Sequence, residues 1–250
     1  SGEVERACSL YQDRIAGRSA PFRFSAGDGV VRVYVDCARR SSLIAAPAVR
    51  RFWHSATPVA SAGGAGAVLI AGGMQLENPA DFVDLTKGEL HDTLELFDVA
   101  QNRFRLLPAV LSRSRVWHQA TAAGQGRVII TEGSTLVESA GRRSFLHLDL
   151  VESFREGRLT QLTAMGSERS AHLALRVGDR LLVAGGLVNG KLLPTATAEL
   201  YDLSSGNSLG PIANMSVPRT FAMAAPVGAG GDALVAGGLW VKDVQVTSDR

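Results

Sequence analysis

The sequence lacks most of the features that would assign it to a membrane, a nucleic acid or a familiar enzyme class. No apolar run approaches the roughly 18 residues that a membrane-spanning helix needs. The formal net charge is only +2, and no basic stripe with interleaved aromatic residues occurs, so we expect no nucleic-acid partner. Gly-x-Ser-x-Gly, His-Glu-x-x-His and phosphate-binding loops are all missing. The sequence therefore favours a protein without catalytic activity, cofactor or metal.

Cysteine is nearly absent. The two that are present, Cys8 and Cys37, have no Cys-x-x-Cys spacing that would indicate a metal site. One interpretation is a disulfide that ties the N-terminal segment to the rest of the chain, which requires an oxidising compartment and predicts a periplasmic, cell-surface or secreted protein. The other interpretation is a pair of buried free thiols.

Glycine, by contrast, is abundant, with 27 residues in a chain of 250. Such a content is typical of short strands joined by many turns. Hydrophobic residues make up 46% of the chain, which is enough to bury a large core in a single all-β domain.

Three landmarks return in the same order along the chain. The first is Arg-x-x-His-x-Ala, with a weaker fourth copy; it begins at Arg51, Arg115, Arg169 and Arg219. The second is an apolar run into Gly-Gly, at residues 68–73, 128–133, 181–186 and 234–238. The third is a strand pattern that ends in Asp, at residues 93–98, 144–149 and 197–202. Landmarks that recur in phase predict units that stack side by side.

These landmarks resemble the kelch repeat, whose unit of about 50 residues forms one four-stranded blade of a β-propeller. The resemblance covers residues 51–250 and implies an all-β fold. Two departures are visible. The tryptophan usual in the fourth strand is replaced, here by Phe104, Leu159 and Leu209, and Glu132 replaces the first glycine of the second unit. We therefore expect the second blade to turn differently after its second strand.

The repeat divides the chain into a segment at 1–26, with a short helix over 4–16, and a propeller at 27–250. The expected units are 51–112, 113–168, 169–218 and 219–250. Residues 29–37 and 41–49 have the pattern of two further strands, and we expect one or both of them to close the last unit. This gives three complete blades and one composite or incomplete blade.

The repeated histidines, His54, His118 and His172, occupy equivalent positions. One interpretation is a ring that binds a metal or an anion. Metal binding needs nitrogen atoms about 2 Å from a single ion, and equivalent positions in different blades lie too far apart for that. We favour packing residues that bond to neighbouring backbone.

The repeated arginines, Arg51, Arg115, Arg169 and Arg219, are expected on the face that also carries the loops between the second and third strands. An arginine fork suits a carboxylate ligand of a partner. The alternative is that each arginine binds carbonyl groups or an acid of the adjacent blade.

The longest of these loops, Met74–Asp92, has 19 residues. Loops of this length are uncommon unless they are functional or disordered. We interpret it as a partner contact, with calcium binding or a plain solvated loop as the alternatives. The candidate contact residues in it are Glu77, Asp81, Phe82, Asp84, Glu89 and Asp92.

The function expected from this pattern is a non-catalytic protein-binding or scaffold module within a larger assembly. The alternative is a carbohydrate-binding or sugar-processing propeller that uses the arginine-bearing face and the channel mouth. Glu132 could act as an acid facing the channel, but we interpret it as an ordinary substitution. Kelch-like copper oxidases need tyrosine ligands, and Tyr11, Tyr34 and Tyr201 match no such motif.

Overall fold

The computed structural model describes residues 47–60, 66–188, 193–227 and 232–240. All of them belong to one compact unit, Ala45–Arg250. The helix predicted over 4–16, the strand predicted over 29–37, and Cys8 and Cys37 lie outside the described residues. Of the strand predicted over 41–49, only residues 47–49 are described, and they form no strand.

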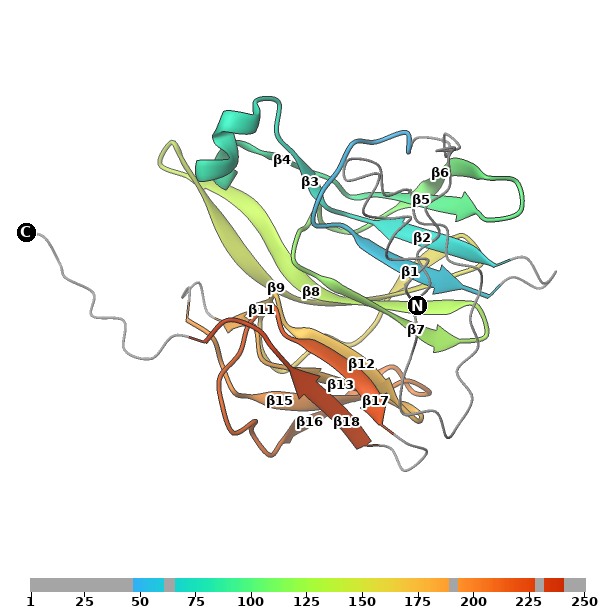
Figure 1. Ribbon diagram of the computed structural model, residues 1–250, viewed down its shortest axis with the longest axis vertical. Coiled ribbons are helices and arrows are strands. Elements are labelled where there is room, and N and C mark those ends of the chain that lie inside the picture. The colour runs from blue at the N-terminus through green and yellow to red at the C-terminus, as the bar shows by residue number, and fades with distance from the viewer. Residues whose placement is uncertain (1–46, 61–65, 189–192, 228–231, 241–250) are drawn as a thin grey trace, which may run out of the picture. The chain divides into compact units, whose positions relative to one another are not determined.

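The described chain is all-β and antiparallel (Figure 1). Sheet I contains β1 (Ser55–Val59), β2 (Ala67–Ala71), β5 (Thr93–Asp98) and β6 (Arg103–Val110). Sheet II contains β7 (Gln119–Gly124), β8 (Arg127–Ser139), β9 (Arg142–Arg155) and β10 (Arg158–Gln161). Sheet III contains β12 (Leu173–Val177), β13 (Arg180–Ala184), β15 (Ala198–Asp202) and β16 (Asn207–Ile212). Sheet IV contains β17 (Met223–Val227) and β18 (Asp232–Ala236).

The remaining elements are short. The strand β3 (Met74–Gln75) pairs with β4 (Glu89–Leu90), and two 3-10 helices, η1 (Pro79–Val83) and η2 (Leu85–Lys87), lie between them. The strand β11 (Arg169–Ser170) pairs with β14 (Leu187–Val188) and with β9. Among the described residues, no helix is long and apolar enough to cross a membrane.

The repeated landmarks have the same structural role in all four units. The first strand of each sheet begins one residue after the histidine position, at Ser55, Gln119, Leu173 and Met223. The residue that follows each repeated arginine pairs with the residue that follows the Gly-Gly position. These pairs are Phe52 with Met74, Val116 with Ser134, Ser170 with Leu187, and Thr220 with Leu239. The predicted periodicity of the strands is therefore confirmed.

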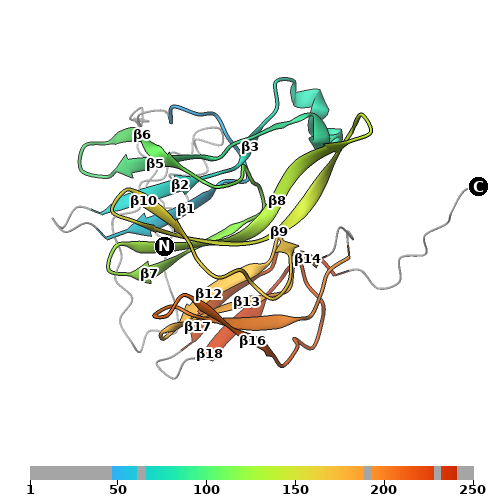
Figure 2. The same ribbon diagram turned by 180° about the vertical axis from the view of Figure 1, so that it is seen from behind.

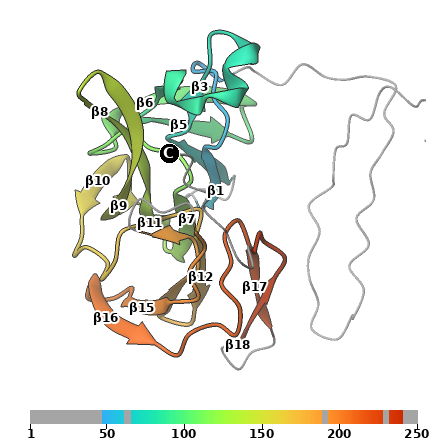
Figure 3. The ribbon, with the colours of Figure 1, turned by 90° about the vertical axis from the view of Figure 1, so that its left-hand side faces the viewer.

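The first strands of successive sheets contact one another in chain order, β1 with β7, β7 with β12, and β12 with β17 (Figure 3). The apolar cores lie between neighbouring sheets. Leu69 of β2 packs with Val128 of β8, and Ile129 of β8 packs with Leu181 of β13. A smaller cluster joins Ala184 of β13 to Val235 of β18. Each sheet thus buries its faces only because a similar sheet lies beside it.

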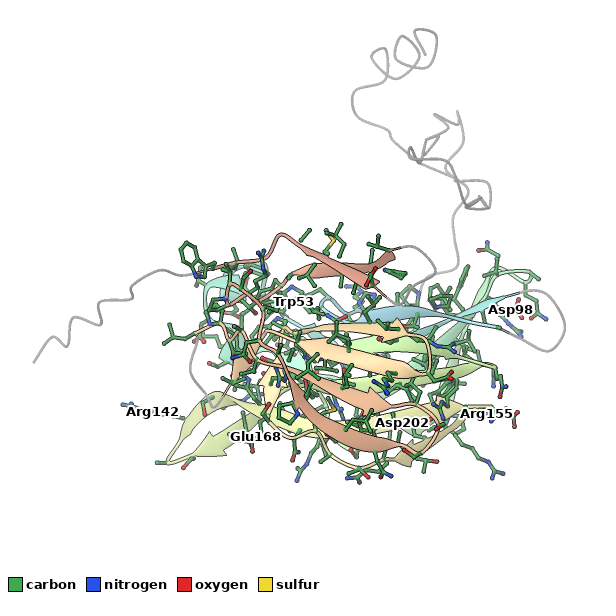
Figure 4. All side chains as sticks on the ribbon, turned by 90° about the horizontal axis from the view of Figure 1, so that it is seen from below. Trp53, Asp98, Arg142, Arg155, Glu168 and Asp202 are labelled. Atoms are coloured by element: carbon green, nitrogen blue, oxygen red, sulfur yellow. The ribbon has the colours of Figure 1, made fainter. Side chains whose placement is uncertain are left out.

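Residues 144–149 form a strand as predicted, within β9, but their predicted alignment with 93–98 and 197–202 was wrong. Opposite the inner half of β8, the β9 residues are 151–154, with Ile130 facing Glu152 and Val128 facing Phe154. The structural counterpart of Glu-Leu-Phe-Asp at 95–98 is therefore Glu-Ser-Phe-Arg at 152–155. Figure 4 shows the three strand ends, Asp98, Arg155 and Asp202, in the same half of the view, away from Trp53.

The cause of the shift is a long hairpin that replaces the turn after the second strand. In sheet II, β8 continues through Glu132 and Gly133 to Ser139, and β9 returns from Arg142, with a register shift between Thr131 and Gly133. The hairpin reaches η2 (Figure 2), where Arg143 Nη2 donates to the Gly88 carbonyl at 3.0 Å. The different course predicted for this unit after its second strand is confirmed.

The Gly-Gly positions allow the chain to approach itself closely, and this predicts a large effect of substitution. A Cβ on Gly186 would lie 2.5 Å from the Ser170 carbonyl oxygen and 2.9 Å from His172 Cβ. We expect Gly186→Ala to lower the free energy of unfolding by roughly 3 kcal/mol. Gly157→Ala is the matched control, because Gly157 also has positive φ but open space around it; there we expect about 1 kcal/mol. Equal losses in urea unfolding would contradict the close-approach argument.

Candidate functional site

Each of the first three repeated arginines forms a buried ion pair with a glutamate on the third long strand of its own repeat unit. Arg51 Nη2 lies 2.8 Å from Glu95 Oε1, and Arg169 Nη2 lies 2.8 Å from Glu199 Oε1. Arg115 pairs in the same way with Glu152. None of these six side chains is more than 5% exposed.

The glutamates occupy one register position. Each stands opposite the residue two before the first glycine position of its sheet, so that Glu95 faces Ile70, Glu152 faces Ile130 and Glu199 faces Val183. The acid thus comes from the same repeat unit as the arginine, whereas the sequence interpretation placed it in the adjacent blade.

Backbone groups satisfy part of each pair, although Arg51 Nε and Arg169 Nε have no hydrogen-bond partner among the described residues. Arg51 Nη1 donates to the Gly72 carbonyl at 2.7 Å, and Arg169 Nη1 donates to the Gly185 carbonyl at 2.9 Å. The carboxylates accept from the backbone three residues before the arginine: Ala48 N to Glu95 at 2.8 Å, Ser112 N to Glu152 at 2.9 Å and Gly166 N to Glu199 at 2.8 Å. These arginines are therefore enclosed in the protein. A partner contact through them stays a prediction.

Arg219, the fourth repeated arginine, has a different environment. Its Nη1 donates to the Gly237 carbonyl at 2.8 Å, in the same way as its counterparts. Within the described part of the chain it forms no ion pair with an acid. The third strand that would supply the acid is not among the strands described in sheet IV.

The acidic residues of the Met74–Asp92 insertion are spread along it. Asp81 pairs with Lys87 at 2.9 Å, Glu89 accepts from Gln75 at 2.6 Å, and the Asp84 side chain accepts from the backbone and the hydroxyl of Thr86. Glu77 is exposed, and the Asp92 carbonyl accepts from the backbone of Leu111. Across the described residues, no group of three or more His, Cys, Asp or Glu side chains is placed to hold a metal ion.

Two of the repeated histidines contact the preceding sheet through side chains, where we had expected bonds to backbone. His118 Nε2 lies 2.9 Å from Ser55 Oγ, and His172 Nε2 lies 2.9 Å from Thr131 Oγ1. His54, in the first unit, is exposed. Burial, with a smaller contribution from the Arg115 charge, lowers the pKa of His118 to about 3. Burial and the Arg169 charge likewise lower the pKa of His172 well below its usual value.

Glu132 is a fully buried carboxyl group between sheets II and III. Its Oε1 lies 3.4 Å from Arg169 Nε, and its Oε2 lies 3.2 Å from His172 Nδ1. These distances alone would suit an ionised carboxylate, but neither contact has hydrogen-bond geometry, and Arg169 is already paired with Glu199. Burial raises the pKa of Glu132 well above its usual value; the Arg169 charge opposes this shift, and the charges of Glu199 and Asp149 add to it. We therefore assign a neutral acid beside a neutral His172, so Glu132 is more than an ordinary substitution.

An aromatic surface lies at the start of the first strands. It consists of Phe52, Trp53, Phe82, Trp117, Phe145 and Phe221. The ring centroids are 5.3 Å apart between Trp53 and Trp117, and 4.7 Å apart between Trp117 and Phe145. Phe82 of the insertion lies 5.8 Å from Trp53. Phe82 is 58% exposed and Phe221 is 47% exposed, so the surface is open to contact.

The repeat itself brings these rings together. Trp53, Trp117, Ala171 and Phe221 occupy the third position of the first landmark, and all have φ between 51° and 56°. Ala171 N donates to the Trp117 carbonyl and Phe221 N to the Ala171 carbonyl, each at 2.8 Å. Positive φ is an outlier for bulky residues, and such outliers cluster at functional sites. The sequence interpretation missed this surface because it treated the third position as variable.

No protein-family model and no curated protein sequence matches the chain. Its fold recurs, since 165 chains of solved structures match it. One of them, described as "Structure of YjhT", has a TM-score of 0.60 and 13% sequence identity and covers 77% of this chain. The match spans 60% of the length of that structure. At this identity the likeness supports the all-β fold and says nothing of activity.

The neutral Glu132 predicts an unusual pH dependence of stability. Because the folded-state pKa is raised, the folded protein holds a proton that the unfolded chain releases above about pH 4.3. Stability is therefore lost as the pH rises toward the folded-state pKa. We expect the free energy of unfolding of Glu132→Gln, relative to that of the wild type, to increase by roughly 1 kcal/mol per pH unit over this range. Urea unfolding at pH 5 and pH 7.5 measures this difference. The exposed Glu156→Gln is the control. A gain independent of pH would refute the assignment.

His118 predicts the opposite slope. Its folded-state pKa of about 3 lies below the unfolded value, so its contribution is complete above about pH 6.5 and is lost on acidification. Between pH 7.5 and pH 5 the wild type should lose roughly 2 kcal/mol through this residue, and His118→Gln should not show that loss. A His118 ring proton resonance that titrates near pH 6.5 would show that the imidazole is not held neutral.

Proposed function

We propose that this chain is a kelch-type β-propeller in which sheets I, II and III are blades and sheet IV begins an incomplete or composite blade. Three observations support this proposal. The landmarks have equivalent structural roles in all four units, the first strands contact one another in chain order, and the ion pair recurs at one register position. A radial arrangement of sheets explains all three.

We propose further that the protein is a non-catalytic binding or scaffold module of a larger assembly, and that the aromatic surface contacts a protein partner. The observation that carries this proposal is the convergence of six aromatic rings from separate parts of the chain on one partly exposed surface. Aromatic residues are enriched at interfaces and dominate their energetic centres. Phe82 extends the surface into the insertion predicted to bind a partner.

The ionisable groups of the described chain support the non-catalytic part of the proposal. The best placed acid and base, Glu132 and His172, have fully buried side chains. A general acid or base must come within hydrogen-bond reach of its substrate. Here the two groups face each other and Arg169 in the buried contact between sheets II and III. A substrate does not reach them there, so we interpret them as packing residues and not as catalytic ones.

Carbohydrate binding is the second candidate, and a concave surface favours it. A cleft of about 910 Å³ lies between sheets I and II, at the opposite end of β1 from Trp53. Its lining combines apolar Leu96 and Leu107 with three arginines, Arg105, Arg155 and Arg158. Ligand sites typically combine an apolar lining with a few polar groups. This cleft is separate from the repeated arginines on which the carbohydrate interpretation of the sequence was based.

Site-directed photo-cross-linking tests the protein-binding proposal. We expect benzoylphenylalanine at position 82 to give one discrete protein adduct in the native cells, and Trp117→Ala in the same chain to reduce its yield about tenfold, because interface aromatics act together. Leu106 is the control position, since it is 49% exposed on the outer strand of sheet I.

If positions 82 and 106 gave the same adducts, or if neither gave any, the result would count against a partner at the aromatic surface. Titration with neutral and acidic oligosaccharides, measured by isothermal titration calorimetry, tests the second candidate. A saturable change that Arg158→Ala abolishes would favour carbohydrate binding at the cleft.

A further inference from the structure

Sheet IV is the only described sheet of the repeat with two strands in place of four. Its β18 pairs with β17, and within the described residues no strand pairs with the other edge of β18. Val235 and Ala224 pack toward sheet III. An unpaired edge of this kind is a template for a further strand.

The other sheets indicate which side chain a strand beside β18 should bring to Arg219. In sheets I, II and III the strand at this position brings a glutamate to the repeated arginine, at 2.8 Å in sheets I and III. Arg219 makes the equivalent bond to the Gly237 carbonyl, so its guanidinium is held where the acid would arrive. A partly buried arginine next to an apolar sheet selects for a carboxylate.

The register of the missing strand follows from the three complete sheets. The glutamate stands opposite the residue two before the first glycine position, which is Val235 in sheet IV. An aromatic residue stands two positions further along the strand, as Phe97 opposite Val68 and Tyr201 opposite Leu181 show; in sheet IV that place is opposite Ala233. Both side chains would point to the side of β18 that packs on sheet III.

We propose that the free edge of β18 binds an antiparallel strand supplied from outside these 250 residues, with a glutamate opposite Val235 that pairs with Arg219 and an aromatic residue opposite Ala233. The proposal rests on the part of the proposed function that takes sheet IV as an incomplete blade, and it is independent of the partner proposed for the aromatic surface.

The chain has no spare segment with the required pattern. Glu-x-aromatic occurs three times, at Glu95, Glu152 and Glu199, and all three copies are already paired inside their own sheets. The N-terminal segment expected to close the last unit has Arg32 two residues before Tyr34, which would place a like charge beside Arg219. A second copy could donate a strand only by opening one of its own complete sheets.

A peptide that copies residues 195–215 is the probe, because it contains Glu199 and Tyr201 with the closing strand of sheet III. We expect the labelled peptide to bind the 250-residue protein in fluorescence anisotropy. The same peptide with Glu199→Gln should bind at least about tenfold more weakly. Because only the peptide differs in this comparison, a folding defect of the protein cannot cause the difference in binding. In the protein, Arg219→Ala should weaken binding of the unmodified peptide to a similar extent, whereas the exposed Arg180→Ala should not.

Hydrogen exchange shows where the peptide binds. We expect the outward amides of β18 to exchange rapidly in the free protein and to become protected when the peptide is added. Failure of the peptide to bind, or equal binding of its Gln variant, would overturn the proposal. Protection of β18 before the peptide is added would mean that the chain covers its own edge. A concentration-dependent dimer that the peptide does not dissociate would mean that a second copy does so. Either result would also overturn it.

Discussion

One buried ion pair between an arginine and a glutamate organises each complete sheet of this protein. Two buried charges stabilise a fold only when their remaining polar atoms are satisfied. Here Arg51 also donates to the Gly72 carbonyl and Glu95 also accepts from Ala48 N, so that Arg51 Nε is the one nitrogen of this guanidinium without a hydrogen-bond partner in the described part of the chain. The pair therefore joins the segment that enters the sheet, the end of its second strand and the middle of its third. Removing either charge would leave the other buried and uncompensated, which explains why arginine recurs at the same point of each unit.

The same connection determines where the aromatic surface forms. After each repeated arginine the chain makes one bridge to the residue beyond the Gly-Gly position and then turns through a residue with positive φ. That residue precedes the first strand, and the first strands lie next to one another. Side chains at this position must therefore gather from successive sheets. The small Ala171 separates Trp117 from Phe221, whose rings are 6.4 Å apart. The repeat determines where these side chains meet, and tryptophan and phenylalanine at this position make the surface aromatic.

The arginine and glycine positions have a nearly constant spacing within each unit, and they predicted the first and second strands. The arginine–glutamate contacts have a variable spacing along the chain, and the sequence did not predict them. The first and second strands follow directly from the arginine and glycine positions, and these were placed correctly. The partners of Arg51, Arg115 and Arg169 are 44, 37 and 30 residues away, because the insertion and the hairpin change the distance along the chain. For the same reason the prediction aligned residues 144–149, whose apolar pattern ends in Asp149, with the inner third strands of sheets I and III, whereas they form the outer half of β9. Arg155 occupies the position of Asp98 and Asp202 in the other sheets. Because it is not an aspartate, the sequence pattern did not identify residues 152–155 as the counterpart of 95–98.

In sheet II a glutamate, Glu132, occupies the first glycine position. In sheet I a Cβ on Gly72 would lie 2.8 Å from both the Arg115 carbonyl and His118, so the first glycine position is where the next sheet approaches most closely. Glu132 occupies that position with φ of 53° and places its side chain against Arg169 and His172 of sheet III. One guanidinium then faces two carboxyl groups, and only one of them, Glu199, can be ionised without leaving an unpaired buried charge. Protonation of Glu132 keeps the contact between the sheets neutral. The long hairpin follows directly after this residue, so the sheet that departs from the glycine pattern is also the one that extends toward η2 and the insertion.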